Sequence, residues 1–204
     1  MIILNRQNNQ FVINLLKNKD KRFFKMNESY RVDIKGYIED LPVLRLPSGI
    51  GIAFFNLHGN PALTEHCGKE LAKLAVGCDV LITAESKGLQ LTHVVARELN
   101  HSYYAVARKS KKLYMQDGIS ISYGSSITTG KAQEFFLSKH DVDLIKGKKV
   151  CIVDDVISTG ESVKGLSELV EKAGGKVYKK LFVLAEGDAK KRDDVSYLAT
   201  IPLL

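Results

Sequence analysis

The chain has 204 residues, of which 45% are hydrophobic and 26% are charged, and this composition excludes wholesale disorder. Its net charge of +7 favours an anionic partner, either nucleic acid or a phosphorylated small molecule. It has neither a signal-peptide pattern nor the run of about 20 apolar residues that a membrane helix needs. Three cysteines without paired spacing suit a reducing compartment, so we expect a cytoplasmic protein without a membrane partner.

The first 60 residues contain short apolar runs broken by Gly and Pro, preceded by a helical pattern over 11–19. Such runs predict short strands. We expect residues 1–60 to form a small lobe that packs on a core of residues 61–204, and the lobe shows no helix-turn-helix pattern.

The core alternates amphipathic stretches with short apolar runs. Helices are predicted over 63–76, 89–99 and 162–173, and strands over 79–84, 102–107, 149–153 and 179–185. This order predicts an α/β fold with a parallel sheet flanked by helices. The Ser-, Gly- and Thr-rich segment 114–130 is a predicted functional loop, and its ISISY run is a candidate hairpin strand.

The segment 150–162, VCIVDDVISTGES, is an apolar strand that ends in two carboxylates and a hydroxyl-rich turn before a helix. In a parallel sheet, ligands bind at the carboxyl ends of the strands. Ionised carboxylates accept hydrogen bonds from sugar hydroxyls, and a helix N-terminus binds phosphate. The segment therefore predicts a sugar-phosphate site made of Asp154, Asp155, Ser158, Thr159, Gly160, Glu161 and Ser162.

Two further strand ends carry groups that suit an anion. AESKG at 84–88 places Ser86, Lys87 and Gly88 before a predicted helix, and ARKSKKLYM at 107–115 contains Arg108, Lys109, Lys111 and Lys112. Cations at these positions would stabilise a negatively charged leaving group.

These three segments resemble those of the type I phosphoribosyltransferases, in particular the adenine and xanthine enzymes. The resemblance implies transfer of phosphoribose from 5-phosphoribosyl-1-pyrophosphate (PRPP) to a purine base, with release of pyrophosphate. Asp154 and Asp155 would hold the ribose hydroxyls, 158–162 the 5-phosphate, and Ser86, Lys87, Gly88, Arg108, Lys109 and Lys112 the pyrophosphate. Glu161 departs from the small residue often found at its position in the family, so its carboxylate must either point away from the phosphate or weaken phosphate binding.

The resemblance also implies a Mg²⁺ ion that PRPP oxygens hold, with Asp154 or Asp155 reaching it directly or through water. Residues 1–60 would be a hood over the base, a non-proline cis peptide would fall near Ser86–Lys87, and we expect a homodimer. Phe23, Phe24, Tyr30, Phe54 and Phe55 are candidates for stacking on the base.

The base itself is predicted from the end of the strand 179–185. Two hydrogen-bond acceptors lie there, a carbonyl near Leu184 and the carboxylate of Glu186, and acceptors suit the amino group of adenine. A lysine, which is a donor that would suit a 6-oxopurine, does not follow until Lys190. The resemblance also implies an alternative, a xanthine or hypoxanthine-guanine enzyme, because adenine enzymes often carry Glu-Tyr-Gly where this chain has Thr128, Thr129 and Gly130, and this loop is similar to that of xanthine enzymes. A rival of another class is a PRPP-sensing regulator that binds nucleic acid, which the intact pyrophosphate loop disfavours.

Overall fold

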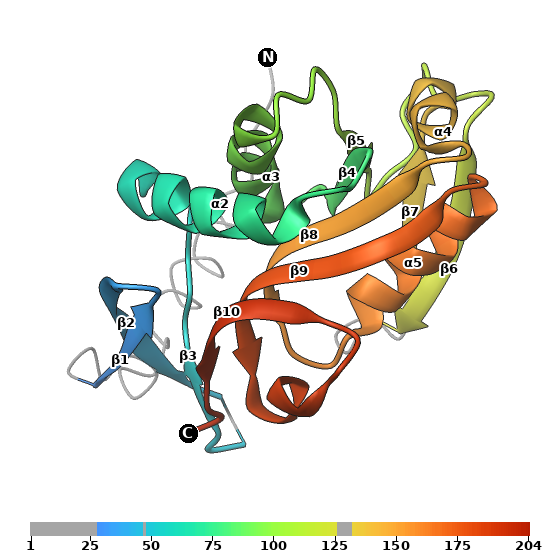
Figure 1. Cartoon of the computed structure of the whole chain (residues 1–204). Coiled ribbons are helices and arrows are strands. Elements are labelled where there is room, and N and C mark those ends of the chain that lie inside the picture. The colour runs from blue at the N-terminus through green and yellow to red at the C-terminus, as the bar shows by residue number, and fades with distance from the viewer. Residues whose placement is uncertain (1–27, 47, 126–131) are drawn as a thin grey trace, which may run out of the picture.

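The computed structural model describes residues 28–46, 48–125 and 132–204. At its centre is a parallel sheet with the strand order β10-β9-β8-β4-β5, which confirms the predicted fold class (Figure 1). The strands are β4 (Val80–Ala84), β5 (Ala105–Ala107), β8 (Lys149–Ile157), β9 (Lys176–Glu186) and β10 (Ser196–Ile201). None of the helices in the described residues is long and apolar enough to cross a membrane.

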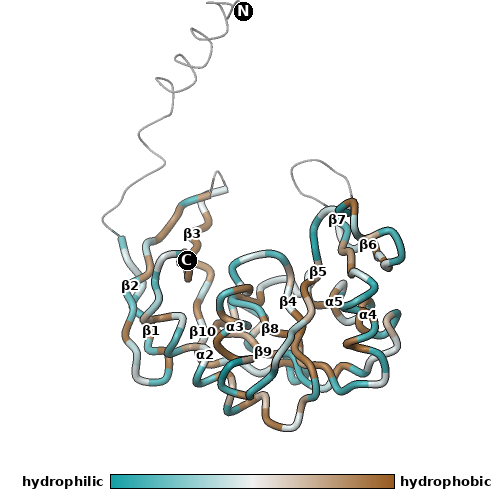
Figure 2. The backbone as a smooth tube through the Cα atoms, turned by 90° about the horizontal axis from the view of Figure 1, so that it is seen from above, coloured by the Kyte–Doolittle hydropathy of each residue, from teal (hydrophilic) through white to brown (hydrophobic). Residues whose placement is uncertain are grey.

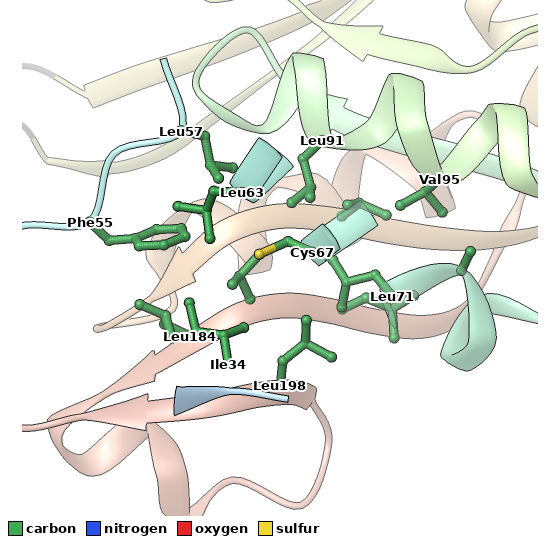
Figure 3. Close-up of a cluster of buried hydrophobic side chains, with 14 of the residues drawn as sticks. Ile34, Phe55, Leu57, Leu63, Cys67, Leu71, Leu91, Val95, Leu184 and Leu198 are labelled. Atoms are coloured by element: carbon green, nitrogen blue, oxygen red, sulfur yellow. The ribbon is translucent and has the colours of Figure 1, made fainter. Parts of the chain in front are cut away.

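Helices cover both faces of this sheet because its central strands are apolar on both sides. On β8, Cys151 and Val153 belong to one buried cluster, whereas Val150 and Ile152 belong to another. The first cluster lies under α2 (Pro61–Ala75) and α3 (Gly88–Glu98), as Figure 3 shows, and the second lies under α4 (Lys139–Ile145) and α5 (Glu161–Lys172).

A second, antiparallel sheet forms from the N-terminal part of the described chain. It contains β1 (Ser29–Ile34), β2 (Tyr37–Arg45) and β3 (Gly51–Ala53) in that order. The C-terminus pairs with it, because the N–H of Gly51 donates to Leu204 O at 2.6 Å and the N–H of Leu204 donates to Gly51 O at 2.9 Å. The boundary at residue 60 stays a prediction, and the predicted helix 11–19 lies outside the described residues.

The candidate hairpin strand is β6 (Ile119–Ser125), which pairs antiparallel with β7 (Ala132–Leu137). The hairpin packs on α5, where Gly165 leaves no room for a side chain: a Cβ there would lie 2.7 Å from the ring of Tyr123. In Figure 2 this hairpin and the β1–β2–β3 sheet lie at opposite ends of the central sheet.

The strands differ from the predicted ones mainly in length. β5 is only three residues long, whereas β8 continues to Ile157 because its later part pairs with β9. Asp154 and Asp155 therefore lie within β8, not after it. The short 3₁₀ helix η2 (Gly187–Lys191) after β9 was not predicted.

Candidate active site

The candidate site lies where the strand order reverses. From β4 the chain continues to β5 on one side, and from β8 it continues through β9 to β10 on the other. Pairing between β4 and β8 ends at Ile82 and Ile152, while β8 runs on. Such a reversal opens a crevice at the carboxyl ends of the two strands, and the segments after β4 and along β8 are the two predicted motifs.

The two carboxylates of β8 meet different partners from the β4 segment. Asp154 Oδ1 accepts from Ser86 Oγ at 3.3 Å and from the N–H of Asp155 at 3.0 Å. Asp155 Oδ2 lies 2.5 Å from the Lys87 ammonium. Burial, and after it the charge of Asp155, raises the pKa of Asp154 to about 7. Asp154 therefore titrates near neutral pH in the ligand-free protein.

Lys87 connects the segment that follows β3 to β8 of the central sheet. Its ammonium donates to Phe55 O at 2.9 Å and lies 5.7 Å from the centre of the Phe54 ring, in addition to its contact with Asp155. Phe55 is buried in the core, which contradicts its candidacy for stacking on a base, because no face of its ring is free. Phe54 is 41% exposed and remains a candidate. Tyr30 packs partly buried against the core, and Phe23 and Phe24 lie outside the described residues.

Gly88 begins α3 beside Asp154. A Cβ there would lie 2.4 Å from Thr83 Oγ1 and 2.7 Å from Asp154 Oδ1, so only glycine fits. The expected cis peptide at Ser86–Lys87 is wrong, since the described peptide bonds are all trans and Lys87 has right-handed helical backbone angles.

The turn after β8 forms a hollow of about 160 Å³, lined by Asp154, Val156, Ile157, Ser158, Thr159, Gly160, Glu161, Ser162, Val163, Leu166 and Phe182. Gly160 has φ +84°, a left-handed conformation that favours glycine, and the next residue begins α5. Glu161 is exposed, with its carboxylate beside Gly124 of β6. The hollow therefore combines polar side chains with the N-terminal end of a helix.

Arg108 follows β5 and meets the β4 segment through Glu85. Its Nη2 lies 3.0 Å from Glu85 Oε1, and its Nη1 donates to the Tyr114 hydroxyl at 3.2 Å. The N–H of Lys109 donates to Glu85 Oε2 at 3.3 Å. We did not predict a role for Glu85. The pairing of Ala84 with Ala107 brings it opposite Arg108, so only the strand order could have indicated the contact.

The other predicted cations of this segment lie farther out. Lys112 donates to Ser110 Oγ at 2.8 Å, and the side chains of Lys109 and Lys111 are exposed. The structure thus places the side chain of Arg108, but not the side chains of Lys109, Lys111 or Lys112, in contact with the loop after β4; Lys109 meets that loop through its backbone N–H alone.

The two residues predicted to bind the base lie at the end of β9. The side chain of Leu184 is fully buried in the core cluster beside Ile34 (Figure 3), and its backbone lies between β8 and β10. Its predicted role thus depends on its backbone alone. Glu186, the last residue of β9, is only 9% exposed.

Among the described residues, no group of three or more His, Cys, Asp or Glu side chains could hold a metal ion by itself. A divalent cation at Asp154 and Asp155 would therefore need most of its ligands from a bound phosphate compound, which fits the chemistry of Mg²⁺.

The comparisons with known proteins agree with this geometry. Residues 56–201 match the phosphoribosyl transferase domain. The chain is 33% identical over 161 residues to the adenine phosphoribosyltransferase of Methanococcus maripaludis, covering 76% of this chain and 86% of that one. It is 33% identical over 127 residues to the xanthine phosphoribosyltransferase of Bacillus cereus, covering 61% of this chain and 63% of that one.

Solved structures give the same result. The adenine phosphoribosyltransferase of Thermoanaerobacter pseudethanolicus superposes with a TM-score of 0.59 and 26% identity, covering 70% of this chain and 83% of that one. The Giardia lamblia enzyme, complexed with 9-deazaadenine, superposes with a TM-score of 0.62 and 21% identity, covering 79% of this chain and 93% of that one. With its sheet, its site at the strand reversal and these relatives, the chain belongs to the phosphoribosyltransferase family.

Proposed function

We propose that this protein transfers phosphoribose from PRPP to a purine base, with adenine as the preferred base, and releases pyrophosphate in purine salvage. The observation that carries the proposal is the crevice between β4 and β8. There a pair of carboxylates lies beside a hollow at the start of α5, and a lysine and a glycine-containing loop face them.

In the proposed complex each part of PRPP meets a different group. The ribose hydroxyls donate to Asp154 and Asp155, and the 5-phosphate accepts from the backbone of 158–162 at the start of α5. Ionised Asp154 is the form that accepts, so substrate binding favours loss of its proton. The pyrophosphate lies towards Lys87, which belongs to the loop after β4 and pairs with Asp155, and towards Arg108, which contacts that loop through Glu85.

The reaction develops positive charge on the ribose ring and negative charge on the departing pyrophosphate. Lys87 and Arg108 stabilise the negative charge as it grows, which lowers the barrier more than it tightens ground-state binding. A bound Mg²⁺ ion, held mainly by PRPP oxygens and by Asp154 or Asp155, would neutralise part of the same charge. The charged pairs Lys87–Asp155 and Arg108–Glu85 keep these side chains ordered before substrate arrives.

Adenine is favoured by the acceptors near the end of β9. The nearly buried carboxylate of Glu186 accepts hydrogen bonds when ionised, and the side chain of Lys190, a donor that would suit a 6-oxopurine, is exposed on η2. Thr128, Thr129 and Gly130, which favour the 6-oxopurine alternative, lie outside the described residues. The relatives include both adenine and xanthine enzymes, so the 6-oxopurine reading is the second candidate.

Two expectations accompany the proposal. The cysteines Cys67, Cys78 and Cys151 are free and buried, which supports a reducing compartment such as the cytoplasm. A homodimer is supported by the exposed apolar side chains of Leu113 and Tyr114, at 94% and 69% exposure. Light scattering on the purified protein measures its mass in solution and so tests whether it is a homodimer.

The proposal is tested by offering adenine, hypoxanthine, guanine and xanthine together at equal concentration, with PRPP and Mg²⁺, and identifying the nucleotide formed. A site that hydrogen-bonds one exocyclic group discriminates by about 10⁴ or more, so AMP should be the dominant product. Exclusive formation of a 6-oxopurine nucleotide would replace adenine by the second candidate. Formation of no nucleotide, with salt-dependent binding of nucleic acid, would favour the regulator.

A further inference from the structure

The turn 158–162 has a second hollow behind it. This hollow has a volume of about 300 Å³ and shares Thr159, Gly160, Glu161 and Val163 with the first one; its remaining lining is Lys164, Ser167, Glu168, Glu171, Lys180 and Arg192. Of these residues, Arg192 comes closest to the Cβ position of Gly160. A Cβ on Gly160 would lie 2.5 Å from Arg192 Nη1, so the guanidinium lies directly against the backbone that caps α5.

The guanidinium is fixed in this place by a two-point contact. Arg192 Nε and Nη2 donate to the two carboxylate oxygens of Asp194 at 2.9 and 2.8 Å, and Lys180 donates to the same carboxylate at 2.7 Å. These cations, Arg192 first, hold the pKa of Asp194 below its ordinary range. A fork bound at Nε and Nη2 has one orientation, and this orientation directs Nη1 at Gly160.

We propose that Arg192 is a positioning residue for the 5-phosphate of the substrate, held by Asp194 and Lys180. The inference deepens the proposed function and depends on it. The guanidinium supports the left-handed turn at Gly160, which sets the direction of the N–H groups that follow in the first turn of α5. Its charge, together with that of Lys180, also offsets the carboxylates of Glu161, Glu168 and Glu171, which line the same hollow and would repel a phosphate.

The first test compares Arg192→Gln with the wild type in binding two probes, ribose 5-phosphate and inorganic pyrophosphate, by titration calorimetry. Because only the first probe carries the 5-phosphate, its affinity should fall about tenfold, the scale of one partly exposed charge contact, while pyrophosphate affinity stays the same. In steady-state kinetics the KM for PRPP should rise with little change in kcat or in the KM for the base. Arg192→Lys, which keeps the charge without the fork, should recover part of the affinity.

The variant Asp194→Asn separates positioning from net charge. It removes a negative charge near the phosphate turn, so long-range attraction alone would tighten ribose 5-phosphate binding. Loss of the fork contact instead frees Arg192 from Gly160, so the inference predicts weaker binding. Tighter or unchanged binding by a folded Asp194→Asn protein would overturn the inference.

The matched control is Lys191→Gln, which makes the same formal charge change at the neighbouring residue. Lys191 pairs with Asp188 in an exposed contact, away from Gly160, so ribose 5-phosphate affinity should not change. An equal loss in Lys191→Gln and Arg192→Gln would overturn the positioning role. If circular dichroism shows that Arg192→Gln does not fold, Arg192→Lys and Asp194→Asn make the decision. Wild-type protein that binds neither ribose 5-phosphate nor PRPP would instead contradict the proposed function itself.

Discussion

Replacing Asp154 with Asn should stabilise the ligand-free protein and at the same time weaken PRPP binding. Burial and the neighbouring charge of Asp155 raise the pKa of Asp154 from 3.8 to about 7. At about 1.4 kcal/mol per pKa unit, the ionised carboxylate costs the native state at most roughly 4 kcal/mol. Asparagine has nearly the same shape and carries no charge, so it removes this cost.

Because the pKa of Asp154 is raised in the folded protein, the free energy of unfolding depends on pH. The folded pKa lies above the unfolded one, so the unfolded chain releases its proton first as the pH rises. The free energy of unfolding of the wild type therefore falls between about pH 4 and pH 7 and has lost this contribution fully above pH 7. The advantage of Asp154→Asn should be small near pH 4 and largest at pH 8.

Urea unfolding of the ligand-free proteins at pH 5, 6, 7 and 8 measures this difference. Asp143→Asn, which removes an exposed carboxylate on α4, is the matched control and should change the free energy of unfolding by less than about 0.5 kcal/mol. Calorimetry with PRPP at pH 8 should show a loss of about 1.5–3 kcal/mol for Asp154→Asn, the contribution of a charge-assisted hydrogen bond. A variant that is no more stable than the wild type at pH 8 would refute the reasoning.

Three other substitutions test neighbouring parts of the site. Lys87→Ala should lower kcat more than it raises the KM for the base, because its partner is the departing pyrophosphate; steady-state kinetics in which only that KM changes would assign it another role. Glu85→Gln should tighten pyrophosphate binding, measured by calorimetry, because it removes the carboxylate that competes for Arg108, and weaker binding would speak against this competition. Gly88→Ala should lower the free energy of unfolding by about 1–3 kcal/mol, since its Cβ would collide with Thr83 and Asp154; an unchanged melting temperature would contradict that crowding.

The α/β order and the turn that joins β8 to α5 could be predicted because both depend on local patterns. Alternating helical and apolar segments indicate a parallel sheet, and VCIVDDVISTGES contains a strand, two carboxylates and a helix start within 13 neighbouring residues. The extent of β8 could not be predicted, since it depends on pairing with β9, which is distant in the sequence.

Side-chain contacts between residues far apart along the chain also could not be predicted from the sequence. Leu184 lies in the uninterrupted apolar run 181–185 of β9, in which no periodicity indicates the face that each residue occupies. The contact of Glu85 with Arg108 depends on β4 and β5 being neighbours. Arg192 reaches Gly160 from a segment with no recognisable motif.

The most direct test of the central claim, that β8 and the turn after it form a PRPP site, is pyrophosphate release measured with PRPP, Mg²⁺ and adenine. The wild type and a folded variant that combines Asp154→Asn with Asp155→Asn are compared, with circular dichroism as the check on folding. We predict base-dependent release of pyrophosphate by the wild type and loss of PRPP affinity by several kcal/mol in the variant, since each change removes an acceptor worth about 1.5–3 kcal/mol. Unchanged PRPP affinity in the folded variant would contradict the assignment of the site.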